Sequence, residues 1–269
     1  MKRVLCLMLF SSLFFSLAAI DNLRLPDMRS LALGSNGVTQ SVFHNPALLA
    51  LSTGKSFHFD YFNRYGLKEL GTMNGSYQQT NRFLPAGIQI STFGYGEYRE
   101  TMARLLVGKR IARRWTLGIG IQYTWIQTLL DTYPAARLST DLGATFLPFD
   151  NLLIGMLIRD FPSFTIRKQT SEIKEINSYK AEIGFQWKII NEMLIVGSLG
   201  ACREVSLSGC LGIEYQVGDA FSFRAGLQTD PFQPTFGVGY RYKAIQIDIA
   251  AVYHSVLGIS TGAGFTLSF

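Results

Sequence analysis

The sequence has few charged residues and, after its first eighteen positions, no long hydrophobic run. Charged residues make up 16% of the chain, against about 25% in typical soluble domains. No later window holds the run of about 20 apolar residues that a membrane-spanning helix needs. An apolar-rich chain without such a helix can still cross a membrane as a closed β-barrel, because strands in a closed ring leave no backbone polar group unpaired.

Cysteine is scarce, and its three positions fit no metal site. Cys6 lies in the N-terminal apolar run, away from any lipid-attachment context. Cys202 and Cys210 flank a predicted hairpin turn near Arg203–Glu204 and are several residues out of register, so we predict two free thiols. Their spacing matches no zinc pattern. The chain also contains no P-loop and no dinucleotide fingerprint, and we expect neither a metal nor a cofactor.

No residue pattern indicates catalysis. The histidines are His44, His58 and His254. His58 and His254 are expected at opposite ends of a barrel, and no nucleophile is marked by its context, so we predict that the protein is not an enzyme. Removal of residues 1–18 lowers the formal charge from +6 to +4, because two basic residues and no acid leave. So small an excess does not suit a nucleic-acid-binding protein, and we expect no nucleic-acid partner.

The first residues follow the order of a secretory signal peptide. A charged start is followed by the apolar run Val4–Phe15 and by the small-residue cleavage site Ser16-Leu17-Ala18. The apolar run is too short to favour a transmembrane anchor. The predicted parts of the chain are a signal peptide over 1–18, a hatch or plug over 19–54 and a β-barrel over 55–269.

From about Lys55 onward, segments of about ten residues alternate between apolar and polar side chains, as transmembrane β-strands do. Ile247 and Ile249, for example, share one face, and Gln246 and Asp248 share the other. Strands of a soluble β-sandwich also alternate, so the number of such segments carries the prediction. The sequence predicts an all-β fold, a transmembrane antiparallel β-barrel of about fourteen strands. The predicted strands are 55–63, 68–79, 84–94, 98–109, 114–127, 135–147, 151–159, 177–189, 192–201, 204–216, 220–228, 234–242, 244–254 and 257–269.

The connections and the aromatic residues indicate one orientation of this barrel. If the short turns face the periplasm, 160–175 is the long connection on the outer side. Aromatic residues predicted to face lipid, such as Trp115 and Trp125, fall near strand ends, where interfacial girdles lie. The last strand ends in Phe269, which resembles the signal read by the barrel-insertion machinery. We therefore expect this machinery and outer-membrane lipid as partners.

Residues 19–54 do not alternate, and they contain Asn45-Pro46-Ala47 followed by Leu49. Asn45 can cap a helix, and Pro46 at the first helical position loses no needed N–H group, so we predict a short helix over 46–51. Here the chain resembles the FadL-like barrels and the related PorV/PorQ group, whose N-terminal hatch carries such a motif just before the first strand. The resemblance implies a plug inside the barrel, and a periplasmic cap is the alternative.

The strand register predicts an inward face rich in glycine and in charges of both signs. A pore selective for one charge favours one sign, so the mixture favours a salt-bridge network that ties wall to wall or wall to hatch. A substrate path is the alternative. The glycines expected to make room for a plug are 118, 120, 143, 184, 212, 226, 237, 239, 262 and 264. The candidate lumen residues are Asp60, Glu100, Arg104, Arg137, Asp141, Lys180, Glu182, Glu214, Arg224, Arg241 and Asp248.

Three functions follow from these patterns. The FadL resemblance implies passive transport of a hydrophobic small molecule through a lumen that the hatch gates. The PorV/PorQ resemblance implies an accessory barrel of the type IX secretion system that binds secreted proteins, with the charged loop Arg167–Glu175 as a docking surface. Both imply the outer membrane of a Gram-negative cell, and the second points to Bacteroidota. The third function is a purely structural barrel.

In FadL-like barrels the ligand leaves sideways through a gap in the wall, which needs a kinked strand. Leu84-Pro85-Ala86-Gly87 opens the third predicted strand. Because proline donates no ladder hydrogen bond, this segment is the predicted place for such a gap.

Overall fold

The computed structural model describes residues 22–269 apart from 82, 130–133, 168–178, 203–206 and 230. The predicted signal peptide over 1–18 and most of the loop Arg167–Glu175 therefore lie outside the described residues. None of the helices in the described part is long and apolar enough to cross a membrane.

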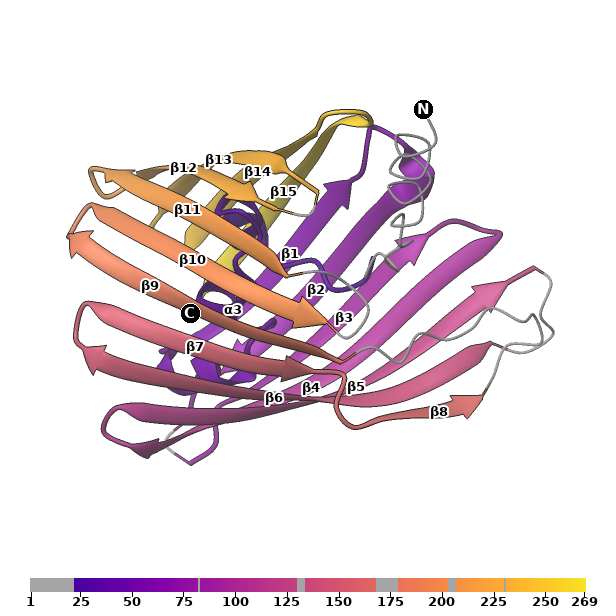
Figure 1. The fold of residues 1–269 in the computed structure, drawn as a ribbon, viewed down its shortest axis with the longest axis horizontal. Helices are drawn as coiled ribbons and strands as arrows, with labels where there is room; N and C mark the ends of the chain where they lie inside the picture. The colour runs from indigo at the N-terminus through magenta and orange to yellow at the C-terminus, as the bar shows by residue number, and fades with distance from the viewer. Residues whose placement is uncertain (1–21, 82, 130–133, 168–178, 203–206, 230) are drawn as a thin grey trace, which may run out of the picture.

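Fourteen antiparallel strands close into a ring, which confirms the predicted barrel (Figure 1). The ring closes between the first and last strands, where Asp60 lies opposite Gly264 on one side and opposite Asn74 on the other. The fifteen strands are β1 (Lys55–Asn63), β2 (Gly71–Gln79), β3 (Ala86–Gly94), β4 (Tyr98–Ala112), β5 (Trp115–Thr128), β6 (Ala135–Phe149), β7 (Leu152–Arg159), β8 (Ser163–Arg167), β9 (Lys180–Ile190), β10 (Met193–Cys202), β11 (Ser208–Val217), β12 (Phe221–Gln228), β13 (Gln233–Tyr242), β14 (Ile245–His254) and β15 (Gly258–Ser268).

The additional strand, β8, lies in a region predicted to be a loop. It pairs with β6 beyond the end of β7, whereas β7 itself pairs with both β6 and β9. Between β7 and β8 the residue Asp160 has φ +57°. Phe161 N donates to Thr140 O, and Thr140 N donates to Pro162 O. β7 and β8 are therefore two parts of one interrupted strand, and the Asp-Phe-Pro sequence at the interruption has the composition of a turn.

Two further predicted strand starts differ from the structure. Residues 68–70 form a 3₁₀ turn, η2 (Lys68–Leu70), so β2 begins three residues later than predicted. Pro85 precedes β3, and its carbonyl accepts a hydrogen bond from Gly108 N. Ala86 is then paired with Gln79 and Val107. The wall is regularly paired after Pro85, and the described interruption lies instead at Asp160.

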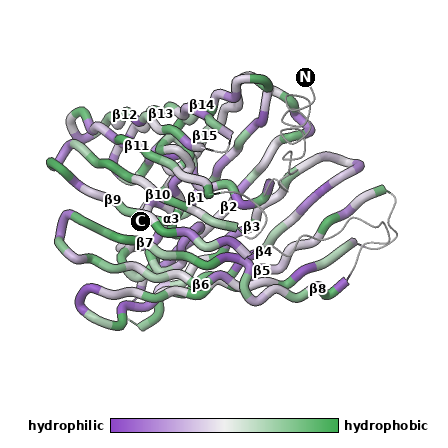
Figure 2. The backbone as a smooth tube through the Cα atoms, in the orientation of Figure 1, coloured by the Kyte–Doolittle hydropathy of each residue, from purple (hydrophilic) through white to green (hydrophobic). Residues whose placement is uncertain are grey.

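The outer surface of the ring is apolar. In β5 the outward residues Leu117, Ile119 and Ile121 are each nearly half exposed, whereas the inward residues Thr116 and Gln122 are buried. Figure 2 shows the resulting green stretches along strands all around the ring. Soluble monomers rarely expose an apolar surface of this extent, and outward apolar with inward polar side chains is the pattern of a strand in lipid.

Residues 22–54 lie inside the ring (Figure 1). Their elements are α2 (Met28–Ala32), α3 (Gly37–Gln40) and η1 (Pro46–Leu51), and η1 occupies the positions of the predicted short helix. We call residues 22–54 the N-terminal segment. α2 packs on β12 to β15, α3 on β7 and β9, and η1 on β4 to β6, so the segment touches opposite sides of the wall.

Candidate functional site

Inward glycines give the N-terminal segment its room. A Cβ atom at Gly118 would lie 2.2 Å from Ala47 N, and one at Gly143 would lie 2.1 Å from Asn45 Oδ1, distances that real Cβ atoms essentially never show. Any side chain at these two positions would therefore displace the segment. The ten glycines predicted to line the lumen do face the segment or an inward side chain of the wall.

Asn45 joins the segment to itself and to the wall. Its Oδ1 accepts from Ala47 N at 3.1 Å and so caps η1, while its Nδ2 donates to Val38 O at 2.8 Å and to Met156 O at 3.5 Å. Because Asn45 is fully buried, the loss of these bonds would leave polar groups without water.

The remaining residues of the motif fill the space beside Asn45. Pro46 and Ala47 lie against Gly118, and Ala47 O accepts from Thr116 Oγ1 at 2.9 Å. Leu49 is fully buried and packs with Phe43 and Leu106. The motif therefore docks on the wall through main-chain groups and small or apolar side chains.

A first ion cluster attaches the start of the segment to the wall. Arg24 Nη1 lies 3.1 Å from Asp141 Oδ1, and Arg24 Nη2 lies 2.8 Å from Asp160 Oδ1. Arg104 Nη2 lies 2.5 Å from the other oxygen of Asp141. Arg104 also donates to the carbonyl of Phe43. Asp141 is fully buried, so its two arginines replace the water that a buried carboxylate would otherwise need.

Asp160, at the interruption of the wall, extends the first cluster. Its Oδ1 accepts from Gln122 Nε2 at 2.8 Å and from Ser139 Oγ at 2.7 Å, and Arg137 Nη2 lies 3.6 Å away. Its backbone N donates to Asp141 at 3.0 Å. The interruption between β7 and β8 thus points an acid into the lumen, where Arg24 binds it.

A second cluster holds α2. Arg29 donates from Nε and Nη2 to the two oxygens of Glu214, both at 2.8 Å. Glu214 also accepts from Arg224 Nε at 2.5 Å, and Arg224 Nη1 lies 2.6 Å from Asp248. A planar guanidinium matches a carboxylate in this paired geometry. Glu214 of the wall therefore binds one arginine of the segment, Arg29, and one arginine of the wall, Arg224.

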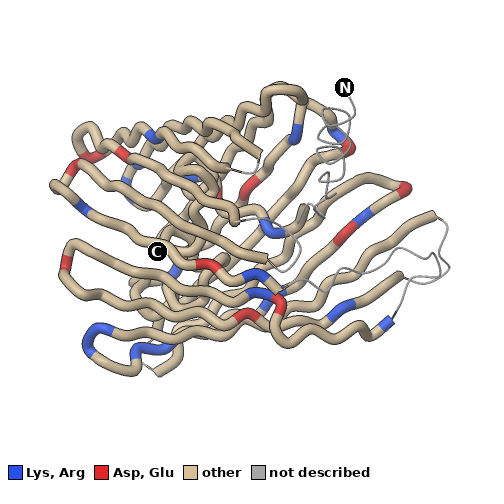
Figure 3. The backbone as a smooth tube through the Cα atoms, viewed as in Figure 1, with Lys and Arg blue, Asp and Glu red and all other residues tan. Residues whose placement is uncertain are grey.

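A third cluster involves His44. Its Nε2 lies 2.6 Å from Glu182, which also lies 2.8 Å from Lys180 Nζ and 3.4 Å from Arg159 Nη2. Burial lowers the pKa of the His44 imidazole below its usual range, although the Glu182 carboxylate acts in the opposite direction. Acidic and basic residues occur on several strands of the ring (Figure 3).

Three of the predicted lumen residues lie outside these clusters. Asp60 accepts from Met28 N at 3.4 Å and from Asn74 Nδ2 at 3.4 Å. Glu100 accepts from Asn22 Nδ2 at 3.3 Å and from Tyr98 Oη at 2.6 Å. Arg241 is exposed and donates to Gln246. Asp60 and Glu100 thus also contact the segment, whereas Arg241 reaches the second cluster only through Gln246, whose Nε2 donates to Asp248 at 2.7 Å.

Sequence reasoning missed five charged or titratable partners in the network. Arg24, Arg29 and His44 belong to the segment, and Asp160 and Arg159 belong to the interrupted strand. A signal for the first two was present, because they are the only Lys or Arg residues between 19 and 54. A segment placed among inward acids needs such cations.

The N-terminal segment packs against the wall beside Arg104, which donates to the carbonyl of Phe43. A space of about 10 Å³ remains there, bordered by Arg24, Phe43, His44 and Arg159 among others. This is about the room that one water molecule needs. A ligand larger than water therefore does not fit in this space.

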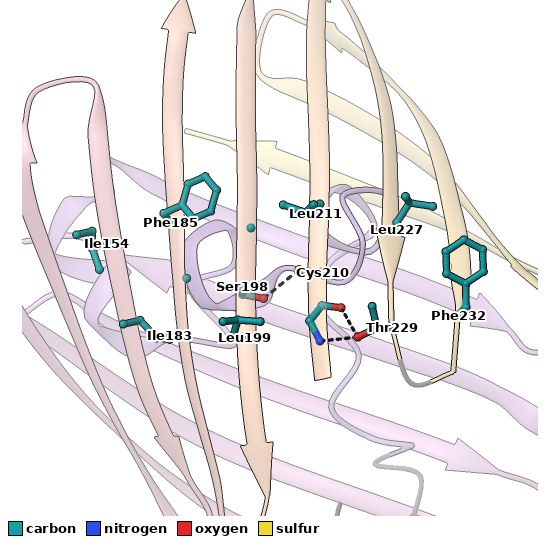
Figure 4. Close-up of a pocket in the computed structure, with 13 residues that line it drawn as sticks. Ile154, Ile183, Phe185, Ser198, Leu199, Cys210, Leu211, Leu227, Thr229 and Phe232 are labelled. Carbon is teal, nitrogen blue, oxygen red and sulfur yellow. Dashed lines mark hydrogen bonds between the residues drawn. The ribbon is translucent and has the colours of Figure 1, made fainter. Parts of the chain in front are cut away.

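A larger hollow of about 620 Å³ lies on the outward face of β9 to β12 (Figure 4). Gly197 and Gly209 leave it open, and Ile183, Leu199 and Leu211 are among the apolar side chains around it. Most of its walls are apolar side chains that face outward, and the inward-facing Gly184, Ser198 and Cys210 also border it.

Comparison with known proteins gives a likeness of fold alone. No family model matches the sequence, and no curated protein matches it. The deltaS2S3 mutant of the TodX monoaromatic hydrocarbon channel superposes with a TM-score of 0.67 at 12% identity, over 90% of this chain and 99% of that one. The Pseudomonas putida toluene transporter TodX gives 0.61 at 11%, over 88% and 95%. A Pseudomonas aeruginosa FadL homologue gives 0.59 at 10%, over 90% and 97%.

Proposed function

We propose that the protein is an outer-membrane channel for passive transport of a hydrophobic small molecule, with the N-terminal segment as its gate. The observation that carries the proposal is that the N-terminal segment lies inside the ring, touches opposite sides of the wall and is held there through ion pairs, hydrogen bonds and close packing. Such contacts can be exchanged without breaking a covalent bond. The apolar outer band supports a membrane location, and the likeness to TodX and to a FadL homologue supports a channel.

The surface beneath the segment supports an apolar cargo. Phe62 and Val252 are buried against α2, and Phe93 and Met102 are buried against Leu23. When the segment moves, these wall residues become accessible inside the ring. These residues and the inward glycines would form a path for a hydrophobic molecule through an otherwise polar lumen. Contact with apolar wall residues keeps the surface of the molecule away from water after it leaves the lipid.

The test releases the gate and measures two kinds of flux. Arg24→Gln combined with Arg29→Gln removes both cations of the segment, and Arg241→Gln is the matched control because Arg241 contacts neither the segment nor a carboxylate of the network. We expect the wild type to speed uptake of the apolar dye N-phenyl-1-naphthylamine into host cells relative to cells without it. We expect the double variant to speed this uptake further and also to raise ion conductance in planar bilayers.

Heat-modifiable mobility on gels checks that each variant forms a barrel. Uptake of the dye at the same rate with and without the folded wild type would overturn the assignment as a hydrophobic channel. Unchanged conductance in a well-folded double variant would overturn the gate. Dye uptake therefore tests whether the cargo is hydrophobic, and conductance tests separately whether the segment is a gate.

The PorV/PorQ-like accessory function remains a prediction without a supporting observation in the described residues. The charged loop Arg167–Glu175, its proposed docking surface, lies mostly outside them. The structural barrel is the outcome in which neither dye uptake nor conductance responds to the variants.

A further inference from the structure

Four basic residues gather at the turn between β4 and β5. Lys109, Arg110, Arg113 and Arg114 are all exposed, and Figure 3 shows blue stretches gathered at this turn. None of the four forms an ion pair with a described residue, whereas Arg24, Arg104 and Arg224 in the lumen are all bound to acids. The turn lies at the same end of the ring as the C-terminus, because β4 ends where β15 ends.

The chain supplies little charge to balance these cations. Between residues 101 and 130 the sequence contains no acid. The neighbouring turn, between β6 and β7, contains the exposed acid Asp150, which forms no ion pair with the four cations. Four like charges within six residues repel one another. A bound anion would remove this repulsion.

The cations begin where the apolar outer band ends. Lys109 is the cross-strand partner of Leu117, and the next outward pair on the same two strands is Val107 with Ile119. Trp115 stacks on Phe146 of β6 with ring centroids 4.5 Å apart. Aromatic rings of this kind lie at the level of lipid headgroups. The basic turn is therefore at the depth of the phosphates of the adjoining leaflet.

We propose that the β4–β5 turn binds the phosphate groups of anionic glycerophospholipids in the leaflet at this end of the barrel. The inference rests on the membrane location given in the proposed function. Arginine binds phosphate oxygens in a paired geometry. The side chain of Lys109 can lie along the apolar band while its ammonium group reaches the headgroup level.

The test compares two sets of substitutions at the same end of the barrel. One variant carries Lys109→Gln, Arg110→Gln, Arg113→Gln and Arg114→Gln. The control variant carries Lys188→Gln, Arg241→Gln and Lys243→Gln, which lie at the other turns of this end. Each protein is inserted into nanodiscs of phosphatidylcholine with a minority of phosphatidylglycerol, and native mass spectrometry counts the lipids retained after release.

We expect the wild type and the control variant to retain phosphatidylglycerol in preference to phosphatidylcholine. The four-residue variant should lose this preference, since each basic residue near an anionic surface strengthens binding about fivefold. Equal retention by the four-residue and control variants would overturn the proposal. It would also be overturned if inorganic phosphate bound the detergent-solubilised protein as tightly as phosphatidylglycerol, because the site would then recognise a free anion.

The proposed function fails separately. A wild type that inserts and transports the dye, but shows no preference for phosphatidylglycerol, overturns the lipid site alone. A protein that forms no barrel in the nanodisc overturns both.

Discussion

The two parts of the N-terminal segment are held in different ways. Residues 22–30 carry both arginines of the segment, which bind Asp141, Asp160 and Glu214 of the wall. Residues 31–51 contain no Lys or Arg. They dock through Asn45, through main-chain groups over wall glycines, and through His44 on Glu182.

The difference bears on which part of the segment can act as a gate. An ion pair keeps its partners within reach after a small displacement, and a shared acid can pass from one cation to another. A main chain packed against a glycine tolerates no such displacement, because the van der Waals attraction between them decreases steeply when they separate by a fraction of an ångström. We therefore expect residues 22–30 to open first and residues 31–51 to remain as the anchor.

The largest effect is expected from Gly118→Leu, which fills the space that the anchor occupies against β5. The new side chain would occupy the place of the main chain of Pro46 and Ala47. The barrel should still form, since Gly118 is one wall residue of β5, but the segment cannot dock, and planar bilayers should show a permanently open conductance. Gly75→Leu is the control, because a Cβ atom there meets nothing within 4 Å. A closed channel with Gly118→Leu would show that the anchor is unnecessary.

The next effect is expected from Arg24→Gln. Arg24 is 4% exposed in its side chain and binds two acids. Removing one partner of a buried pair costs about 3 kcal/mol or more, and because Asp141 retains Arg104 we expect the low end. Amides of residues 22–30 should then exchange hydrogen roughly 100-fold faster, and those of residues 31–51 much less. Equal acceleration in both parts would mean that the segment opens as one unit.

Asn45→Ala should reverse this order and loosen the anchor. The loss of a helix cap costs about 1 kcal/mol, and the Val38 carbonyl left without its buried donor costs about 1 kcal/mol more. Hydrogen exchange over residues 37–51 should rise roughly 30-fold, with a measurable rise in conductance. Asn151→Ala, in the exposed turn between β6 and β7, is the control. If conductance stays flat while the barrel assembles, the segment does not plug the channel through this motif.

Much of the barrel could be predicted from the sequence because each strand carries its own local pattern. Alternation, as in 245–254, and the even spacing of the turns predicted most strand boundaries to within a few residues. β8 was missed because Asp160-Phe161-Pro162 interrupts the pattern, and the pairing of Ser163–Arg167 with β6 depends on a partner over 20 residues away.

The candidate site was harder to predict than the barrel. Inward acids such as Asp141 and Glu214 follow from the strand register, since alternation fixes which face a residue takes. Their partners Arg24 and Arg29 lie in a segment without alternation, where no periodic pattern predicts which acid each arginine binds. The exposed position of Arg241 also could not be seen, because alternation gives the face of a residue and not its depth along the barrel.

The smallest effect is expected from Arg29→Gln, and a change of salt concentration should distinguish its exposed ion pair from the buried pairs of Arg24. The side chain of Arg29 is 33% exposed, and Glu214 keeps Arg224 at 2.5 Å when Arg29 is removed. We therefore expect a cost of about 1 kcal/mol, the upper end for a solvent-exposed pair, and roughly fivefold faster exchange in α2. In the wild type, a change from about 0.1 M to 1 M salt shortens the screening length from about 10 Å to about 3 Å. Exchange in α2 should rise with salt in the wild type and stay constant in Arg29→Gln. Amides beside the buried Arg24 should be insensitive in both, and a salt response there would mean that water already reaches the first ion cluster.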